Sequence, residues 1–262
     1  MVEKIMTILA FVGVPLSILG SLFHWSTLLM FAIYCVTIVA LASFMGRATE
    51  SLAIVMGPRI GGLLNATFGN AVELIISIFL LKAGLINIVL ASLTGSVLGN
   101  LLLVAGLSFF VGGMKYKRQS FNIYEARHNA GMLIFAVIVA FVIPEVFSTH
   151  MTMEDTMIIS VGISIILILL YFSALLFRFV THRGVYQKNK DDAVEKEAHV
   201  EPEWSQMKAI IILLISTIAV GYVAEHLVGT FEVIGETFGW SELFIGVIIV
   251  AIVGNAAEHS SA

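Results

Sequence analysis

The amino-acid sequence predicts an all-α, polytopic membrane protein, and three observations support this prediction. The first is composition: 59% of the 262 residues are hydrophobic and only 12% are charged, about half the charged share of a soluble domain. The second is a mean hydropathy of +1.00, spread over apolar runs about as long as a bilayer crossing. The third is that two similar short motifs, each holding an amide and a carboxylate, lie inside such runs.

Eight membrane spans are expected, and the connections between them set an orientation. The expected spans cover residues 5–22, 27–45, 61–81, 86–113, 130–147, 157–180 and 207–229, and an eighth begins near residue 243 and is still apolar at Ala262. With this order Lys82 is the one Lys or Arg of the connections on its side, and the others fall on the opposite side. Short cytoplasmic loops are enriched in Lys and Arg, so we expect a cytoplasmic N-terminus.

The two motifs indicate an internal repeat. Gly-Asn-Ala-Val-Glu at 69–73 matches Gly-Asn-Ala-Ala-Glu at 254–258 with an offset of 185 residues (258 minus 73), and the surroundings of Glu50 match those of Glu225 with an offset of 175 (225 minus 50). Five spans separate the starts of the two units, and an odd number inverts the second, as in secondary transporters. We expect an extra N-terminal helix (1–25), a first five-helix repeat (26–180), an acidic cytoplasmic linker (181–206) and the start of an inverted repeat (207–262), truncated by roughly three spans.

Intramembrane acids and amides are the candidate site. Asn70 and Glu73 are spaced i,i+3, as are Asn255 and Glu258, so each pair shares one helix face. Ionisable residues at membrane depth are costly and mark ion pathways. Two carboxylates and two amide oxygens make an oxygen cage that suits a hard cation such as Ca²⁺. Thiolate and paired imidazole ligands are missing from these motifs, which argues against zinc or copper there.

Other residues extend this site. Gly69 and Gly254 precede the amides, where a helix could break and release backbone carbonyls for the cation. Ser92, Ser96 and Asn100 share a face of the fourth span, and Asn100 is a further candidate ligand; an equal alternative for the serines is that they only join helices. In the same span, Gly95 and Gly99 would let another helix approach closely.

The two glutamates are also expected to bind protons, for an electrostatic reason. Two nearby carboxylates in a low dielectric cannot both remain charged, so Glu73 and Glu258 would hold either protons or one divalent cation. Glu50 and Glu225 could relay protons, or they could be interfacial charges that reach water. His259 could tune the proton affinity of Glu258, or be a packed neutral histidine. His24 and His150 lie in expected external connections and receive no role. Trp25, Trp204 and Trp240 are expected to anchor the chain at the membrane interface.

The residues also resemble those of a known family. The runs 69–74 and 254–259 are similar to the two signature motifs of the calcium/proton exchangers, a branch of the calcium/cation antiporter superfamily, and the run 95–100 and the acidic linker extend the likeness along nearly the whole chain. The resemblance is strongest to bacterial members. It implies eleven spans in two inverted five-helix units after an extra helix, and a bacterial plasma membrane. It also implies Ca²⁺ exchange for protons, with Glu73 and Glu258 alternating between the two.

Several other functions were weighed. A sodium/calcium exchanger of the same superfamily is the first alternative, and a cation channel is the second. An enzyme is disfavoured because no nucleophile–base set or His-Glu-x-x-His motif occurs, and no cofactor is expected beyond the transported Ca²⁺ and protons. Basic patches suited to nucleic acid are absent, so the expected surroundings are the lipid bilayer. Homo-oligomer formation is left open.

Overall fold

The computed structural model describes residues 2–118, 120–148, 151–177 and 201–256. Within these ranges every regular element is a helix, including short π-helical stretches, so the predicted all-α class is confirmed there. Seven helices are long and apolar enough to cross a membrane, and a bent pair, Phe231–Phe238 with Glu242–Gly254, would make an eighth. The described residues therefore agree with eight expected spans.

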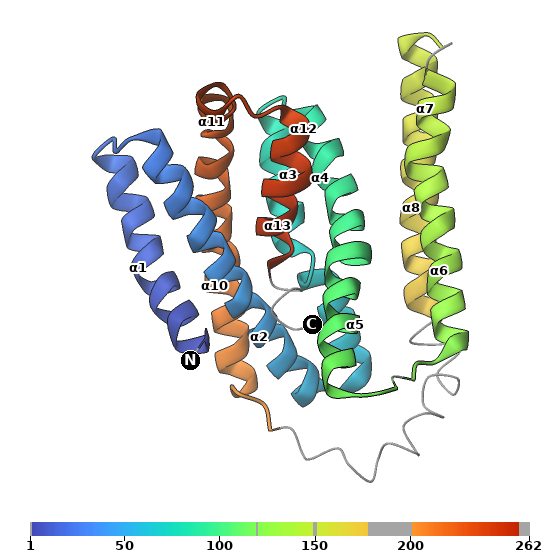
Figure 1. The fold of residues 1–262 in the computed structure, drawn as a ribbon, viewed down its shortest axis with the longest axis horizontal. Coiled ribbons are helices and arrows are strands. Elements are labelled where there is room, and N and C mark those ends of the chain that lie inside the picture. Colours follow the sequence, from blue (N-terminus) through green and yellow to red (C-terminus); the bar gives the residue numbers. More distant parts are fainter. Residues whose placement is uncertain (1, 119, 149–150, 178–200, 257–262) are drawn as a thin grey trace. The chain divides into compact units, whose positions relative to one another are not determined.

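The chain divides into two compact units, Met1–Lys115 with Val200–Ala262, and Tyr116–His199. Both candidate motifs lie in the first unit. Its helices are α1 (Val2–Leu22), α2 (Thr27–Phe68), α3 (Ala71–Lys82), α4 (Ile86–Leu98), η1 (Gly99–Val104), α5 (Ala105–Lys115), α10 (Gln206–Val228), α11 (Phe231–Phe238), α12 (Glu242–Phe244), η4 (Ile245–Val250) and α13 (Ala251–Gly254) (Figure 1).

The core of this unit is the pairing of α2 with α10, which lie side by side in Figure 1. Small residues make this close packing possible, because Ala42, Ala48 and Ala224 are fully buried and bring the two backbones together. Aliphatic side chains fill the remaining space, for example Leu52 and Leu227. The first helix of the first predicted repeat thus packs on the first helix of the second.

The second expected span and the first part of the third form one bent helix. Helix α2 continues past the expected connection to Phe68, with a kink at Gly57, whose φ of 82° and ψ of 172° are open only to glycine. The third span, Ile60–Lys82, therefore combines the end of α2 with α3. Gly69 and Asn70 separate the two helices, so this span is interrupted where the first motif begins.

The segment ahead of α10 is fixed to α2 by a cluster around Arg47. The guanidinium makes two contacts with the Glu203 carboxylate, of which the Nε–Oε2 distance is 2.8 Å, and lies 4.8 Å from the ring centroid of Trp204. Trp204 also stacks on Phe44 at 6.0 Å and is only 8% exposed. The expected interfacial anchor is therefore a packed residue, because its ring is enclosed between an aromatic ring and a cation.

The second unit is a helical hairpin. Its elements are α6 (Ile123–Val137), η2 (Ile138–Val142), α7 (Ile143–Ser148) and α8 (Met153–Leu176). The side chain of Thr152 caps α8, since its Oγ1 accepts a hydrogen bond from the Asp155 N–H at 3.2 Å. Most of its large apolar side chains are exposed, Met153 and Met157 among them, as expected of helices that face lipid or further helices.

Candidate cation site between the two motifs

The two motifs meet in the structure. A Cβ placed on Gly254 would lie 2.8 Å from Cγ of Glu73, which is closer than a real Cβ comes to another heavy atom. Gly254 therefore packs directly on the side chain of Glu73, which lies half-buried in the first turn of α3. The positive end of the helix dipole favours a negative charge at that position. The contact places the backbone of one motif beside the carboxylate of the other.

Asn255 is the most enclosed polar side chain of this region, with 2% exposure. Its Nδ2 donates to the Ala251 carbonyl at 2.8 Å. Its Oδ1 accepts from Ser96 Oγ and from Asn100 Nδ2, both at 3.4 Å. These two distances exceed the usual hydrogen-bond range, so the amide oxygen is held only weakly by these two neighbours.

The two asparagines have matching local structures. Asn70 has φ −99° and ψ 9°, and Asn255 has φ −86° and ψ 9°. Each Nδ2 donates to a carbonyl four residues earlier, from Asn70 to Ala66 at 3.4 Å and from Asn255 to Ala251 at 2.8 Å. Each amide nitrogen thus faces a carbonyl of its own helix, more closely in Asn255 than in Asn70.

The helix that carries Ser96 and Asn100 is held close by two glycines. A Cβ on Gly95 would lie 2.4 Å from the Val247 carbonyl oxygen, and a Cβ on Gly246 would lie 2.4 Å from Cβ of Ala91. The predicted role of Gly95 in close helix approach is confirmed. For Gly99, no atom of the described residues lies within 4 Å of its Cβ position, so no close helix approach is seen there; Gly99 begins η1.

Ser92 differs from the other polar residues on its face. Its Oγ donates to the Val89 carbonyl at 2.8 Å, so it bonds to its own helix, whereas Ser96 and Asn100 reach Asn255.

Gly246 was missed by sequence reasoning, because a lone glycine in an apolar run gives no signal of its own. Gly246 and Gly95 both lie where α4 packs on η4, and this shared role becomes visible only when the contact between the two elements is known.

The remaining predicted site residues fall into two groups. Glu258 and His259 lie outside the described residues. Glu50 is exposed on α2, and the Glu225 carboxylate lies 3.0 Å from Lys82 Nζ, with half or more of each side chain exposed. Lys82 ends α3 nine residues after Glu73, about 14 Å along the helix. The pair is therefore remote from the motifs.

Oxygen and amide groups dominate the site. Across the described ranges, no three side chains of His, Cys, Asp or Glu converge on a point. The contacts bring the Glu73 side chain beside Gly254, and the amide of Asn255 beside the Ser96 hydroxyl and the Asn100 amide. Such hard donors suit a cation like Ca²⁺, which takes six to eight oxygens in a flexible arrangement.

The fold and the site together define an integral membrane protein with a polar centre between two related, helix-interrupting motifs. The chain belongs to the sodium/calcium exchanger protein family, whose model matches residues 26–180 and 208–262. It is 69% identical over 260 residues to the Ca²⁺/H⁺ antiporter ChaA of Bacillus subtilis (strain 168), covering 99% of this chain and 74% of that protein.

A more distant relative and a solved structure also match most of the chain. The chain is 41% identical over 262 residues to a Ca²⁺/H⁺ antiporter of Synechocystis sp. (strain ATCC 27184 / PCC 6803 / Kazusa), covering 95% of this chain and 70% of that one. The structure titled native YfkE matches with a TM-score of 0.82 and 62% sequence identity, covering 98% of this chain and 71% of that chain. The chain thus spans nearly three quarters of the YfkE chain, and the fold is that of YfkE over the shared length.

Proposed function

We propose that the protein exchanges Ca²⁺ for protons across a membrane, with Glu73 and Glu258 binding either Ca²⁺ or protons. The single observation that carries the proposal is the contact of Gly254 with Glu73, because it joins the two motifs at one point. Glu258 follows Gly254 by four residues in the sequence. The printed names of the two bacterial relatives, both Ca²⁺/H⁺ antiporters, support the same function.

The chemistry of the proposal follows from charge. In a site enclosed by helices, two carboxylates without a cation repel each other and are poorly solvated, so both favour protonation. One Ca²⁺ neutralises the two carboxylates as well as two protons do. The amides of Asn70, Asn100 and Asn255 then add neutral oxygen ligands. Glu50, Glu225 and His259 are proposed to assist proton movement.

Alternating access follows from the predicted inverted repeat. The pairing of α2 with α10 supports it, since each helix comes from a different repeat and their relative motion would change which side the site faces. In the same proposal the N-terminus lies in the cytoplasm of a bacterial cell, because Lys82 is the one Lys or Arg of the connections predicted on the external side.

Calcium-45 uptake into inverted vesicles with an imposed pH gradient, acid inside and without sodium, tests the proposal. Wild-type protein should accumulate Ca²⁺ until the gradient is dissipated. Glu73→Gln and Glu258→Gln should each abolish uptake. Glu232→Gln is the matched control, because Glu232 also lies in the first turn of a helix but is exposed on α11, and it should transport normally.

The alternatives give different results in the same vesicles. Uptake that needs a sodium gradient and ignores the pH gradient would assign sodium/calcium exchange instead. Calcium flux that needs no counter-ion and far exceeds carrier turnover would indicate a channel. Unchanged uptake in the Glu73→Gln protein would overturn the role of that carboxylate in either kind of exchange.

A further inference from the structure

An apolar groove lies among helices α1, α2 and α10. Its volume is about 380 Å³, within the range of about 300–1,000 Å³ that is typical of ligand cavities. In its lining Leu41 and Ser216 are buried, whereas Phe11 and Ile215 are 73% and 62% exposed. The two exposed residues belong to helices long and apolar enough to cross a membrane, so the open side of the groove faces the hydrocarbon of the bilayer.

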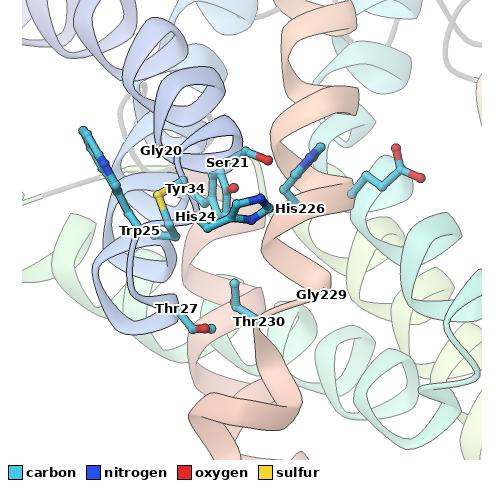
Figure 2. A pocket seen from close by; sticks show the side chains of 11 residues that line it. Gly20, Ser21, His24, Trp25, Thr27, Tyr34, His226, Gly229 and Thr230 are labelled. Atoms are coloured by element: carbon cyan, nitrogen blue, oxygen red, sulfur yellow. The ribbon is translucent and has the colours of Figure 1, made fainter.

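Helices α1, α2 and α10 also border a second cavity, of a different character. It measures about 420 Å³ and lies at the α1–α2 turn, where its lining includes the polar side chains of His24, Tyr34 and Thr230 (Figure 2). Such polar groups need hydrogen-bond partners, so that cavity suits water. In the groove, by contrast, Ser216 is the one polar side chain among the described lining residues, and the groove therefore suits an alkyl chain.

The groove ends close to two cations. The Phe44 ring belongs to its lining and stacks on Trp204 at 6.0 Å. Both cations lie against the same indole ring, since Cζ of Arg47 is 4.8 Å and Nζ of Lys208 is 5.8 Å from its centroid. Positive charge therefore lies one aromatic ring beyond the apolar lining, at the level where α10 begins.

Of the two cations, Lys208 has an uncompensated charge. Glu203 engages Arg47, whereas Lys208 has no ion-pair partner among the described residues and is exposed. Lys208 also lies on the face of α10 that borders the groove, because the lining residues Ile212 and Ile215 follow it by four and seven positions. An apolar groove with an unpaired ammonium at its end matches a molecule with an alkyl chain and an anionic head.

We propose that this groove binds one acyl chain of an anionic phospholipid, whose phosphate lies close to Lys208. Basic pockets between membrane helices bind anionic lipid headgroups in this way. The groove is too small for a helix of another protein, because one turn of a helix, about 10–12 Å wide and 5.4 Å long, exceeds its volume. In the expected orientation Lys208 follows the cytoplasmic linker, so the lipid belongs to the cytoplasmic leaflet.

Photolabelling in vesicles tests the site without relying on transport. The protein is reconstituted with phosphatidylglycerol that carries a diazirine in one acyl chain, and a phosphatidylcholine analogue is used in parallel. Adducts of the wild-type protein should concentrate in residues 10–15 and 212–219. Labelling by phosphatidylglycerol should exceed labelling by phosphatidylcholine about threefold or more, because only the former carries a net negative charge for the ammonium to attract.

Two variants test the groove itself. Ala219→Phe places a ring in the lining and should reduce labelling of both segments about fivefold or more, since a filled cavity has no room for the chain. Phe11→Ala removes an exposed side chain, with little risk to folding, and should reduce labelling about twofold through lost apolar contact. Ile218→Phe is the control, because Ile218 is the neighbour of Ala219 but is 74% exposed and outside the lining; it should label normally.

A third variant tests the charge. Lys208→Gln should remove the preference for phosphatidylglycerol and leave labelling by phosphatidylcholine unchanged, and high salt should weaken the same preference in the wild-type protein. Lys117→Gln is the matched control, because Lys117 is also exposed and lies in a connection expected on the same side of the membrane. It should retain the full preference.

Three results would overturn the proposal. Adducts spread evenly over the exposed helices, or undiminished in both Ala219→Phe and Phe11→Ala, would mean that lipid only surrounds the protein. Equal labelling of the wild-type protein by the two lipids would remove the anionic headgroup. Crosslinks through the groove between two copies of the chain would assign it to an oligomer contact. A failure of Ca²⁺/H⁺ exchange leaves the labelling result standing, so the two proposals fail separately.

Discussion

Gly254 fits against Glu73 with no room for a methyl group, and the two residues belong to motifs that are 185 positions apart (254 minus 69). Such a contact makes the first motif sensitive to small changes in the second. It also explains the glycine of the second motif, which admits the facing side chain of Glu73.

Gly254→Ala should therefore reduce Ca²⁺ transport severely while the protein remains folded. The added methyl group would have to displace the Glu73 side chain, whose Cγ lies 2.8 Å from the Cβ position. Vesicle uptake and thermal unfolding measure the two effects. Gly99→Ala is the control, because no other described residue lies within 4 Å of its Cβ position and alanine favours helix over glycine by up to about 1 kcal/mol. Equal transport by both variants would contradict the importance of this contact.

Gly95→Ala and Gly246→Ala should each destabilise the protein by about 1–3 kcal/mol, the usual cost of overpacking. Each new methyl group would meet the backbone or Cβ of the opposing helix at 2.4 Å, and backbone atoms cannot rotate away. Thermal unfolding in detergent is the measurement. Gly106→Ala, in open surroundings on α5, should not lower the melting temperature. A melting temperature unchanged in all three variants would mean that α4 and η4 separate readily.

Arg47→Lys should lower the melting temperature although it keeps the charge. Lysine cannot reproduce the forked contact with Glu203 or the stacking on Trp204, and we expect a loss of about 1–2 kcal/mol. Arg118→Lys is the control because Arg118 is exposed. If the two variants unfold at the same temperature, the Arg47 cluster contributes nothing that a simple positive charge does not.

Glu225→Gln should change the free energy of unfolding by less than about 1 kcal/mol, because an exposed ion pair contributes little. Its side chain and that of Lys82 are 50% and 70% exposed. The proposed relay role makes a separate prediction: slower exchange at saturating Ca²⁺ with an unchanged half-saturating concentration. Lys82→Gln, which breaks the same pair, should leave the rate unaltered. A normal rate in Glu225→Gln would reduce this residue to an interfacial charge.

Much of the architecture could be predicted because it depends on local patterns. Apolar length predicts the spans, and the glycine–asparagine pairs correctly indicate where the third span is interrupted, since Asn70 and Asn255 share almost the same backbone conformation. The common face of Ser96 and Asn100 follows from their spacing. The structure adds what spacing cannot give, namely that both side chains reach Asn255.

The contacts that sequence reasoning missed join residues far apart in the chain. Arg47 and Glu203 are separated by 156 positions, and neither stands in a motif. Gly57 likewise gave no sign that α2 would continue through the expected connection, since one glycine among apolar residues is compatible with many conformations.

The attachment of Glu203 and Trp204 to α2 also affects how the chain tolerates insertions, deletions or a break ahead of α10. The register of α10 is set by that anchor, two residues before the helix begins at Gln206. Insertions or deletions upstream of Glu203 would then be absorbed before they reach the helix. The halves could accordingly be made as separate polypeptides and still recognise each other, provided that the break leaves the anchor on the second piece.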